Sequence, residues 1–534
     1  MKRLFAYLLC ALLCSTAFAD RRPFTPAVKL NAAQSIIENF YVEDVDNDTV
    51  VNEAIKAMLK TLDPHSAYTT PDETKEFTEP LNGKFSGIGV QFNMLDDTVY
   101  VVQTVPGGPS EKVGILAGDR IVAANDTVIA GKKFKNTQVM KYLRGPKDSL
   151  VNLHVKRGNE YIDFAVIRDD IPLYSVDETF MANPTTGYIR ITRFAEGTAD
   201  EVAQAIAKLK AQGMRDLIID LSDNGGGYLG AAFEIASQFL PEGTPVVSTA
   251  GRAMPPSTYT TEGQGSFLNG KIVVIANQNS ASASEILAGA LQDNDRALVV
   301  GRRTFGKGLV QRPFPFPDGS MIRLTVSRYY TPSGRCIQKH YDKGHSEEYQ
   351  LELLNRYQDG ELWSADSIQR PDSLRYYTLR NHRPVYGGGG IIPDVFVPAD
   401  TSYYSTYYRD IVAKGVVNRT VINYVDANRA ALKAQYPDAA SLRRDFVLQQ
   451  ELLDTLIANG EAEGLRFDET MWNRSRPIVE AIMAGLIARD LHEDGSYYYP
   501  LSKLSRDFNA ALDLIGDPLR YEELLVGVYE EQQP

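Results

Sequence analysis

The sequence is poor in cysteine. It contains three cysteines in 534 residues, and two of them, Cys10 and Cys14, lie within the first twenty. The rest of the chain keeps only Cys336, so after removal of the N-terminal segment it can form no internal disulfide. No histidine stands close to Cys336 in "SGRCIQ", and we expect a structural role for this thiol. The fold must therefore be stabilised by packed apolar cores.

Metal-ligand spacing and basic charge are also absent. The six histidines are scattered, and neither an HExxH nor a CxxC motif occurs, which argues against a zinc enzyme. The net charge of -12 disfavours a nucleic-acid partner, because binding to phosphates needs a basic surface. We expect neither a metal nor another cofactor.

Long apolar runs are missing except at the N-terminus. There, "MKR" precedes "LFAYLLCALLC", and "AFA" ends at Ala19. This pattern is typical of a secretory signal peptide over residues 1–19, and the run is short for a membrane span. A lipid anchor on Cys10 or Cys14 is the alternative, although each follows leucine instead of a small residue. We therefore expect an exported, periplasmic protein, with membrane association left open.

The remaining length suggests several domains. Residues 24–82 are predicted to be helical, and 83–170 contain short β-type runs such as "TVYVVQTV" and "LVNLHVKR" between turn residues. Residues 171–400 form the next unit, in which the polar stretch 338–388 is interpreted as an insertion or flexible excursion. Residues 401–534 are predicted to be a helical domain.

The third unit has the pattern of an α/β core. "DLIIDL", "KIVVIAN" and "RALVVG" are continuous apolar runs, as in the strands of a buried parallel sheet. The helix-like stretch "TADEVAQAIAKLKAQG" precedes the first of them. Strands that alternate with helices predict βαβ units and a layered α/β fold.

A serine stands at one strand-to-helix junction of this core. In "NQNSASASEILAGALQD", Ser282 follows the "KIVVIAN" strand and precedes an apolar helix. The N-terminus of a helix presents free N–H groups and a partial positive charge, so the N–H of Ala283 could bind an oxyanion. The alternative for these serines is a capping role, which we expect for Ser284.

A lysine could serve as the base for Ser282. Lys307 stands in "RTFGKGLVQ", and serine–lysine pairs are an alternative to the catalytic triad. The amine must be neutral, so its pKa has to fall by about 3 units, at a cost of about 4 kcal/mol. Burial among Phe305, Leu309 and Val310 could produce this shift. Gln311 lies four residues later, so on a strand it would face the same side and could orient the amine. A solvated lysine is the alternative.

A glycine-rich turn follows the strand at 217–222. "DLSDNGGGYLG" lacks the GxxxxGK[ST] spacing of a phosphate loop. We interpret it as a nest of backbone N–H groups in which Gly226 or Gly227 supplies a second oxyanion donor. A turn that needs glycine for steric reasons alone is the alternative.

Together these residues resemble the catalytic core of the carboxy-terminal processing peptidases, also called tail-specific proteases, of the S41 serine peptidases. Lys307 follows Ser282 by 25 residues and Gln311 follows Lys307 by four, as in that family. "LDPHSAY", "TVSRYYTPSGRCIQ" and "GIIPDV" are similar to further family signatures, and Asp293 matches an aspartate that we interpret as structural. The glycine turn departs from the pattern, with Ser222 where arginine is common and Gly225 where proline is common.

The resemblance implies a fold and a second module. The core would be a ClpP/crotonase-like α/β protease fold, and residues 83–170 would be an inserted PDZ domain. "FSGIGV" resembles the carboxylate-binding loop of such domains, whose backbone N–H groups would come from Gly87, Ile88, Gly89 and Val90. A peptide end would add to the sheet edge there. For Arg168, which closes the module, we expect a surface salt bridge, with contact to substrate or protease core as the alternative.

The implied function is that of an exported serine endopeptidase. Ser282 would attack the peptide bond, Lys307 would accept its proton, Gln311 would complete the site, and the PDZ domain would bind protein or peptide substrates with apolar C-termini. A homodimer through the helical termini and an adaptor protein are further partners to consider. The alternatives are a catalytically silent peptide-binding scaffold of the same fold and, more remotely, a carrier of small apolar ligands.

Overall fold

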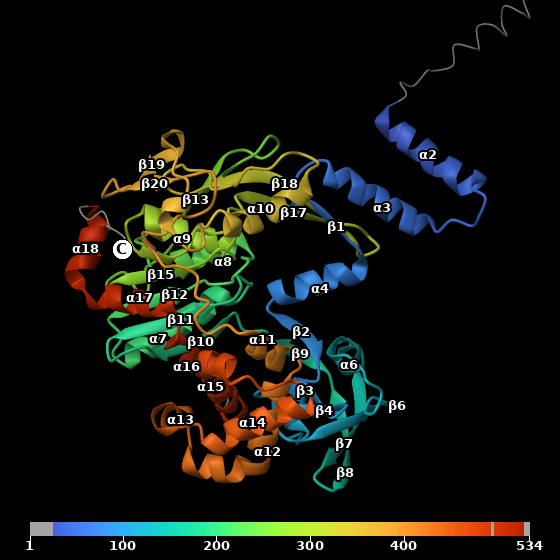
Figure 1. Cartoon of the computed structure of the whole chain (residues 1–534). Helices are drawn as coiled ribbons and strands as arrows, with labels where there is room; N and C mark the ends of the chain where they lie inside the picture. Colours follow the sequence, from blue (N-terminus) through green and yellow to red (C-terminus); the bar gives the residue numbers. More distant parts are fainter. Residues whose placement is uncertain (1–24, 493–495, 528–534) are drawn as a thin grey trace, which may run out of the picture.

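The computed structural model describes residues 25–492 and 496–527. The signal peptide expected at residues 1–19 lies outside the described residues. An α/β core forms one end of the molecule, and a β-rich module and a helical bundle form the other (Figure 1). None of the helices in the described part is long and apolar enough to cross a membrane.

A six-stranded sheet forms the centre of the α/β core. Its strands, in spatial order, are β10 (Val176–Met181), β11 (Thr186–Ile191), β12 (Asp216–Asp220), β15 (Ile272–Ala276), β16 (Leu298–Gly301) and β21 (Val395–Phe396). β10 is antiparallel to β11, and all other pairs are parallel. The three apolar runs singled out in the sequence are β12, β15 and β16, whose apolar side chains are buried as predicted.

Helices cover both faces of this sheet. On one face α7 (Thr198–Ala211), α8 (Leu229–Ala236) and α9 (Ala283–Asp293) pack on every second strand residue. The other face is covered by α17 (Arg506–Gly516) and α18 (Pro518–Val526), whose Leu514 and Tyr521 share a core with Ile218 and Val273. The last two helices of the predicted C-terminal domain thus complete the core of the α/β unit.

A second, five-stranded sheet lies beside the helices. It consists of β1 (Ala67–Thr69), β13 (Pro245–Ala250), β14 (Ser257–Thr260), β17 (Leu309–Pro315) and β18 (Met321–Tyr330). β18 is its longest strand and pairs antiparallel with β1, β13 and β17. This arrangement brings the N-terminal "LDPHSAY" stretch onto the α/β core.

The β-rich module has its own core. Its elements are β3 (Val90–Leu95), β4 (Thr98–Thr104), α5 (Pro109–Lys112), β5 (Arg120–Ala124), β6 (Thr127–Val128), α6 (Asn136–Leu143), β7 (Leu150–Arg157) and β8 (Glu160–Ile167). The ladder order β3-β4-β5-β7-β8 leaves β3 at an edge. An antiparallel ribbon of β2 (Lys84–Gly87) and β9 (Asp169–Pro172) connects the module to the rest of the chain.

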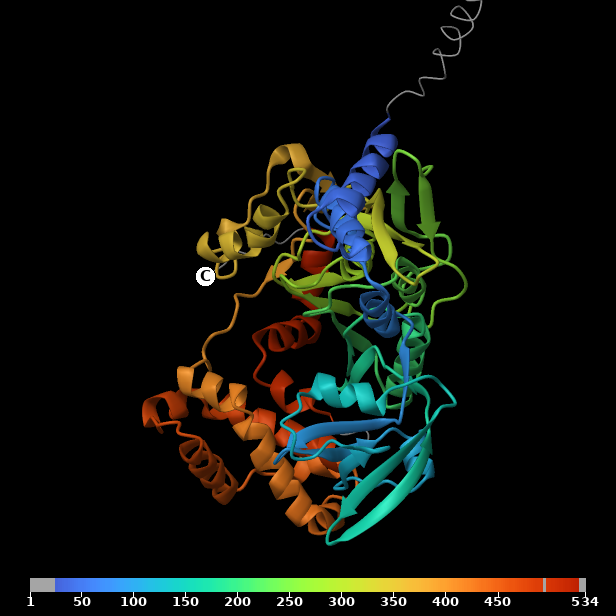
Figure 2. The same cartoon turned by 90° about the vertical axis from the view of Figure 1, so that its right-hand side faces the viewer.

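The helical bundle lies beside this module (Figure 2). It comprises α11 (Thr406–Ala413), α12 (Val416–Gln435), α13 (Ala439–Asp445), α14 (Gln450–Ala462), α15 (Glu469–Leu491) and α16 (Tyr498–Ser502). The Tyr100 hydroxyl donates a hydrogen bond of 3.0 Å to Asp426 of α12, and Ile422 packs with Leu95 and Val102. The bundle therefore contacts the outer face of β3 and β4.

The predicted helical segment near the N-terminus contains α2 (Pro26–Phe40), α3 (Asn47–Lys60) and α4 (Pro71–Leu81). α2 extends away from the body of the molecule (Figure 1), and none of its residues is buried. The stretch 338–388 is ordered in the described chain. It forms α10 (Ser346–Gln358), the 3-10 turns Ala365–Ser367 and Asp372–Leu374, and the hairpin of β19 (Arg375–Tyr377) and β20 (Pro384–Tyr386).

Candidate active site

Six residues that the sequence singled out line one pocket of about 370 Å³. Ser282 and Ala283 lie at the start of α9, and Gly226 and Gly227 lie in the turn after β12. Lys307 and Gln311 reach the pocket from the loop before β17 and from β17 itself; α4 and β18 supply the remaining wall. The fold thus brings together side chains that are up to 85 positions apart in the chain.

Ser282 occupies a strained backbone position. Its φ of 59° and ψ of -114° place a non-glycine residue where few L-residues are found, and such strain is concentrated at functional sites. The residue is the N-cap of α9, follows the turn after β15, and is part of the lining of the pocket. Ser282 is half-buried at the strand-to-helix junction that the sequence predicts.

Lys307 is half-buried at the pocket. Burial lowers the pKa of its amine, the positive charge of Arg323 lowers it further, and Glu285 and Asp63 act in the opposite direction. No hydrogen bond joins its Nζ to Ser282 Oγ in this structure. Leu309 and Val310 line the pocket as expected, whereas Phe305 packs away from it against Lys339 and Tyr349.

Gln311 lines the same pocket without contacting the lysine. Its amide donates to Thr325 Oγ1 at 3.1 Å and to the carbonyl of Leu309 at 3.3 Å. The predicted reason, that residues four apart on one strand face the same side, does not apply. Lys307 precedes β17, and a β-bulge separates Val310 from Gln311. The bulge turns Gln311 towards the pocket.

Two residues that the sequence analysis missed connect Ser282 to Lys307. The buried carboxylate of Glu285 accepts the backbone N–H groups of Ser282 at 2.8 Å and of Lys307 at 2.9 Å. It also accepts Gly306 N–H and the Thr304 hydroxyl, while burial raises its pKa. The Tyr329 hydroxyl lies 3.2 Å from the carbonyl oxygen of Ser282 and 2.6 Å from that of Lys307. The Ser-x-x-Glu spacing of a capping box was a sequence signal for Glu285, and Tyr329 lies within the "TVSRYYTPSGRCIQ" signature, which does not by itself single out this tyrosine.

The glycine turn packs directly on Ser282. A Cβ on Gly226 would lie 2.8 Å from the Cβ of Ser282, and one on Gly227 would lie 2.1 Å from the carbonyl oxygen of Phe194. Only glycine fits at either position. The N–H of Gly226 donates to the Asn224 side chain at 2.8 Å. In the described chain the N–H groups of Gly227 and Ala283 have no acceptor.

The neighbouring serines hold this turn in place. The Ser284 hydroxyl donates to the carbonyl of Asn224 at 2.8 Å, so its expected role as a helix cap is wrong. Ser282 itself occupies the N-cap position. Ser280 donates to the carbonyl of Leu221 at 2.7 Å. Both buried hydroxyls therefore tie α9 to the loop that carries Gly226.

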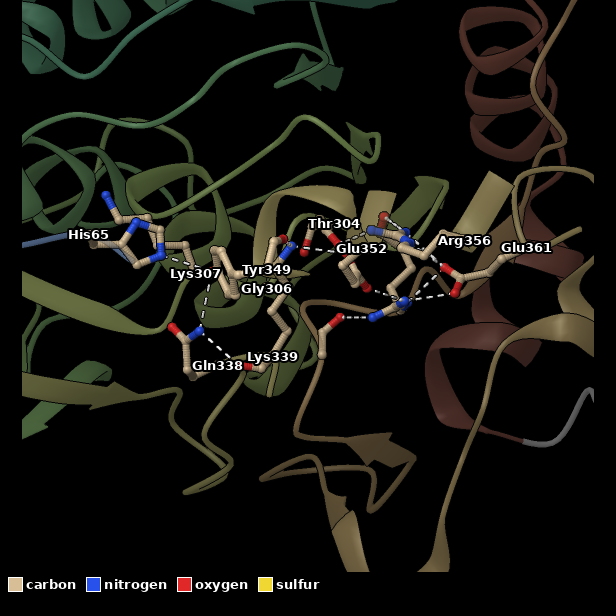
Figure 3. Close-up of polar contacts among 12 residues, drawn as sticks. His65, Thr304, Gly306, Lys307, Gln338, Lys339, Tyr349, Glu352, Arg356 and Glu361 are labelled. Carbon is tan, nitrogen blue, oxygen red and sulfur yellow. Dashed lines mark hydrogen bonds and ion pairs between the residues drawn. The ribbon is translucent and has the colours of Figure 1, made fainter. Parts of the chain in front are cut away.

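The "LDPHSAY" stretch contacts the residues that hold Gln311 in the pocket. Asp63 accepts the Ser66 hydroxyl at 2.6 Å and the Thr325 hydroxyl at 2.9 Å, and Thr325 in turn binds Gln311. His65 Nε2 lies 2.8 Å from the hydroxyl of Tyr349 (Figure 3). Burial and the nearby charge of Lys307 lower the pKa of His65 to about 4, so this ring is neutral at pH 7.

The insertion 338–388 holds the loop that carries Lys307. Gln338 accepts the N–H of Gly308 at 2.8 Å, and the N–H of Lys339 donates to the carbonyl of Gly306 at 2.9 Å. Arg356 donates to the carbonyls of Thr304 and Arg303. Figure 3 shows the ion pairs that fix these side chains, which join Lys339 to Glu352 and Arg356 to Glu361. The insertion is therefore part of the framework of the site.

The predicted peptide-binding loop lies in the β-rich module, outside this pocket. Gly87 ends β2 and Val90 begins β3, with Ile88 and Gly89 between them. The N–H groups of Ile88 and Gly89 have no acceptor in the described chain. Arg168 is buried and donates to the carbonyls of Leu143 and Tyr142 at the end of α6, so the expected surface salt bridge is wrong.

No group of three or more metal-binding side chains occurs within residues 25–492 and 496–527. The site carries its chemistry in a half-buried amine, a hydroxyl at a helix N-terminus and two backbone N–H groups. This arrangement suits acyl transfer through a serine nucleophile.

Family models match four parts of the chain. Residues 185–346 match the model described as peptidase family S41, and residues 86–167 match the PDZ domain. Residues 18–73 match the N-terminal domain of the activating protease CtpB, and residues 407–493 match a family of unknown function (DUF8443). The first two matches coincide with the α/β core and with the β-rich module.

Proteases from bacteria and a solved protease structure are similar to this chain over about 60% of its length. The carboxy-terminal processing protease CtpB of Bacillus subtilis is 37% identical over 334 residues, which are 61% of this chain and 68% of that protein. A probable CtpA-like serine protease of Staphylococcus epidermidis is 34% identical over 311 residues, 58% of this chain and 62% of that protein, so less than two thirds of its length is matched. The solved structure of a photosystem II D1 C-terminal processing protease is 30% identical and covers 59% of this chain and 84% of its own, with a TM-score of 0.35.

Proposed function

The chain belongs to peptidase family S41, the family of carboxy-terminal processing serine proteases, and we propose that it cleaves proteins through Ser282 and Lys307 after capture of their C-terminal tails. The observation that carries this proposal is the single pocket that contains Ser282, Lys307 and the free N–H groups of Ala283 and Gly227. A nucleophile, a base and oxyanion donors must share one site for acyl transfer.

In the proposed reaction Lys307 acts as a neutral amine. It accepts the proton of Ser282 Oγ as that oxygen attacks the peptide carbonyl, and it returns the proton to the leaving amine. Water then hydrolyses the acyl-enzyme ester on Ser282. Burial and the charge of Arg323 favour the neutral amine at moderate pH. Proton transfer requires Nζ to approach Oγ to about 2.6–3.2 Å, and no hydrogen bond in the described chain holds Nζ in another position.

The oxyanion would be bound by Ala283 and Gly227. Both N–H groups are free, whereas that of Gly226 is occupied by Asn224. Ala283 adds the partial charge of the N-terminus of α9 to its hydrogen bond. Of the two glycines that the sequence left open, the hydrogen bonds favour Gly227. We assign Gln311 the role of orienting Lys307 when the amine turns towards Ser282.

The PDZ domain would recognise the tail of the substrate. β3 lies at the edge of its sheet, so a peptide can pair with it while its terminal carboxylate binds the N–H groups of the Gly87–Val90 loop. The terminal side chain would enter the apolar space between this strand and α6. An amidated tail should therefore bind more weakly than a free carboxylate, which competition binding with paired peptides would measure.

We further propose a homodimer through the N-terminal helices. α2 and the turn after it expose large apolar side chains, with Phe40 81% and Val42 87% exposed. Such a patch normally marks an interface. Sedimentation of the wild type and of Phe40→Glu would test it. A wild-type dimer that becomes a monomer in the variant supports the proposal, whereas a monomeric wild type would indicate that the patch binds an adaptor protein instead.

Residues 1–19 support an exported, periplasmic location, which fractionation of producing cells would check.

The decisive experiment compares wild type, Ser282→Ala and Lys307→Ala on an unfolded protein with an apolar C-terminus. Cleavage by the wild type and loss in both variants supports the proposal. Equal cleavage by all three would contradict it. Tail binding without cleavage by any of them would instead indicate the catalytically silent scaffold.

A further inference from the structure

A second cation faces the pocket beside Lys307. Arg323 lies on β18, and its side chain lines the same cavity as Ser282 and Lys307. Its guanidinium carbon is 3.9 Å from the ring centroid of Phe77 on α4, which fixes its position on the wall. In the reaction described above Arg323 acts only through its charge, which lowers the pKa of Lys307, and its guanidinium contacts none of the reacting atoms.

The guanidinium of Arg323 lacks an anionic partner. Its Nε is buried without a hydrogen-bond acceptor, and no carboxylate pairs with the group in the described part of the chain. Four other poorly exposed arginines of the α/β core have carboxylate partners, namely Arg302 with Asp507, Arg303 with Glu361, Arg335 with Asp293 and Arg383 with Asp295. A half-buried guanidinium without an acceptor is costly and is suited to bind an anion.

No residue of the pocket itself can supply that anion. Its lining contains two cations, Lys307 and Arg323, and no aspartate or glutamate. The two carboxylates that act on the neighbouring Lys307 already have partners: Glu285 binds the backbone of Ser282 and Lys307, and Asp63 binds hydroxyl and backbone groups. Charge complementarity therefore points to a carboxylate that arrives with the substrate.

We propose that Arg323 binds the side-chain carboxylate of a substrate aspartate or glutamate next to the scissile bond, and so sets a preference for acidic residues there. The inference rests on the proposed protease function, because it names the substrate class of the same site. Phe77, Leu81 and Met321 form an apolar wall around the carboxylate, and this low-dielectric surface strengthens the ion pair. The fork of the guanidinium allows two parallel hydrogen bonds.

Two variants isolate this role. Arg323→Gln removes the charge, and Arg312→Gln is the matched control, because Arg312 lies on the neighbouring strand β17, is exposed and does not line the pocket. Peptides that carry glutamate, glutamine or lysine at each position around the cleaved bond are compared by kcat/KM at the high-pH plateau. Arg323→Glu tests the reverse preference.

At one position the wild type should cleave the glutamate peptide at least tenfold better than the glutamine peptide, the effect of a charge-assisted hydrogen bond. The preference should vanish in Arg323→Gln, persist in Arg312→Gln and change to lysine in Arg323→Glu. If Arg323 had only a structural role, Arg323→Gln would lower kcat/KM equally for all peptides, and this result would overturn the inference. Equal cleavage of the glutamate and glutamine peptides by the wild type would also overturn it. In both cases, cleavage that depends on Ser282 would still support the protease function. If no cleavage depended on Ser282, both the protease function and the acidic preference would be contradicted.

Discussion

Glu285 and Tyr329 share the same two partners. Glu285 accepts the backbone N–H groups of Ser282 and Lys307, and Tyr329 binds the carbonyl oxygens of the same two residues. The backbones of the proposed nucleophile and base are thus held together although their side chains form no mutual hydrogen bond. The backbone of Lys307 is thus fixed by hydrogen bonds, whereas its Nζ forms none in the described chain.

Replacement of Glu285 by glutamine should reduce kcat by more than tenfold. The carboxylate accepts four hydrogen bonds, and an amide can satisfy only part of them, which leaves buried donors without acceptors. The Ser282 backbone would relax and misalign the hydroxyl. Cleavage kinetics check this, with Glu234→Gln on the exposed side of α8 as control. Full activity of Glu285→Gln would show that the bridge is dispensable.

The variant Tyr329→Phe keeps the buried ring and removes only the hydroxyl. Two carbonyl oxygens lose their donor, at an expected cost of about 1–3 kcal/mol of stability. Thermal unfolding should show a lower midpoint than for Tyr330→Phe, the adjacent tyrosine, whose hydroxyl has no such bonds in the described chain. Equal midpoints for the two variants would contradict this role of Tyr329.

We expect the charge of Arg323 to determine the pH at which kcat/KM begins to rise from its low value in acid. Its charge lowers the pKa of Lys307, and loss of that charge raises the pKa, so more of the lysine is protonated at a given pH. The groups around the amine are Arg323 on β18, Glu285 on α9, and Asp63 and His65 from the loop before β1. For a neutral peptide, the rise of kcat/KM with pH should shift to higher pH in Arg323→Gln and stay unchanged in Arg312→Gln. A shift to lower pH would contradict the neutral-lysine mechanism.

His65 should make stability fall in mild acid. Its pKa is about 4 in the folded protein and 6.5 in the unfolded chain, so between these values only the unfolded chain binds the proton. Above pH 6.5 His65 contributes no pH dependence to the free energy of unfolding. As the pH falls from 6.5 to 4, this free energy decreases, and the total decrease reaches about 3 kcal/mol. Unfolding midpoints of His65→Gln should vary less over this range than those of the wild type or of the exposed His340→Gln. Parallel curves would rule out the buried, neutral ring.

Gly227→Ala should abolish cleavage while Gly230→Ala leaves it intact. A Cβ at Gly227 would meet the Phe194 carbonyl at 2.1 Å and force the turn away from Ser282, whereas a Cβ at Gly230 meets open space in α8. Loss of one oxyanion donor costs about a hundredfold or more in kcat. Because alanine keeps the N–H and only the added Cβ displaces it, an active Gly227→Ala variant would show that cleavage does not depend on the position of this turn, which contradicts the proposed role.

The sequence predicted the parts of the site that local patterns encode. Continuous apolar runs gave β12, β15 and β16, and the strand-to-helix junction gave the position of Ser282. Contacts between distant segments could not be inferred. The apolar faces of α17 and α18 do not reveal that they cover the central sheet, and nothing local connects Tyr329 or Arg323 to the pocket. The bulge before Gln311 likewise depends on pairing with β18.

The central claim is that Ser282 becomes acylated when Lys307 removes its proton. Acid quenching of the enzyme during turnover of a slow ester or peptide, followed by mass mapping, tests it most directly. The account predicts an acyl group on Ser282 in the wild type and none in Lys307→Ala. An adduct on another residue, or the same amount of adduct without the lysine, would contradict it.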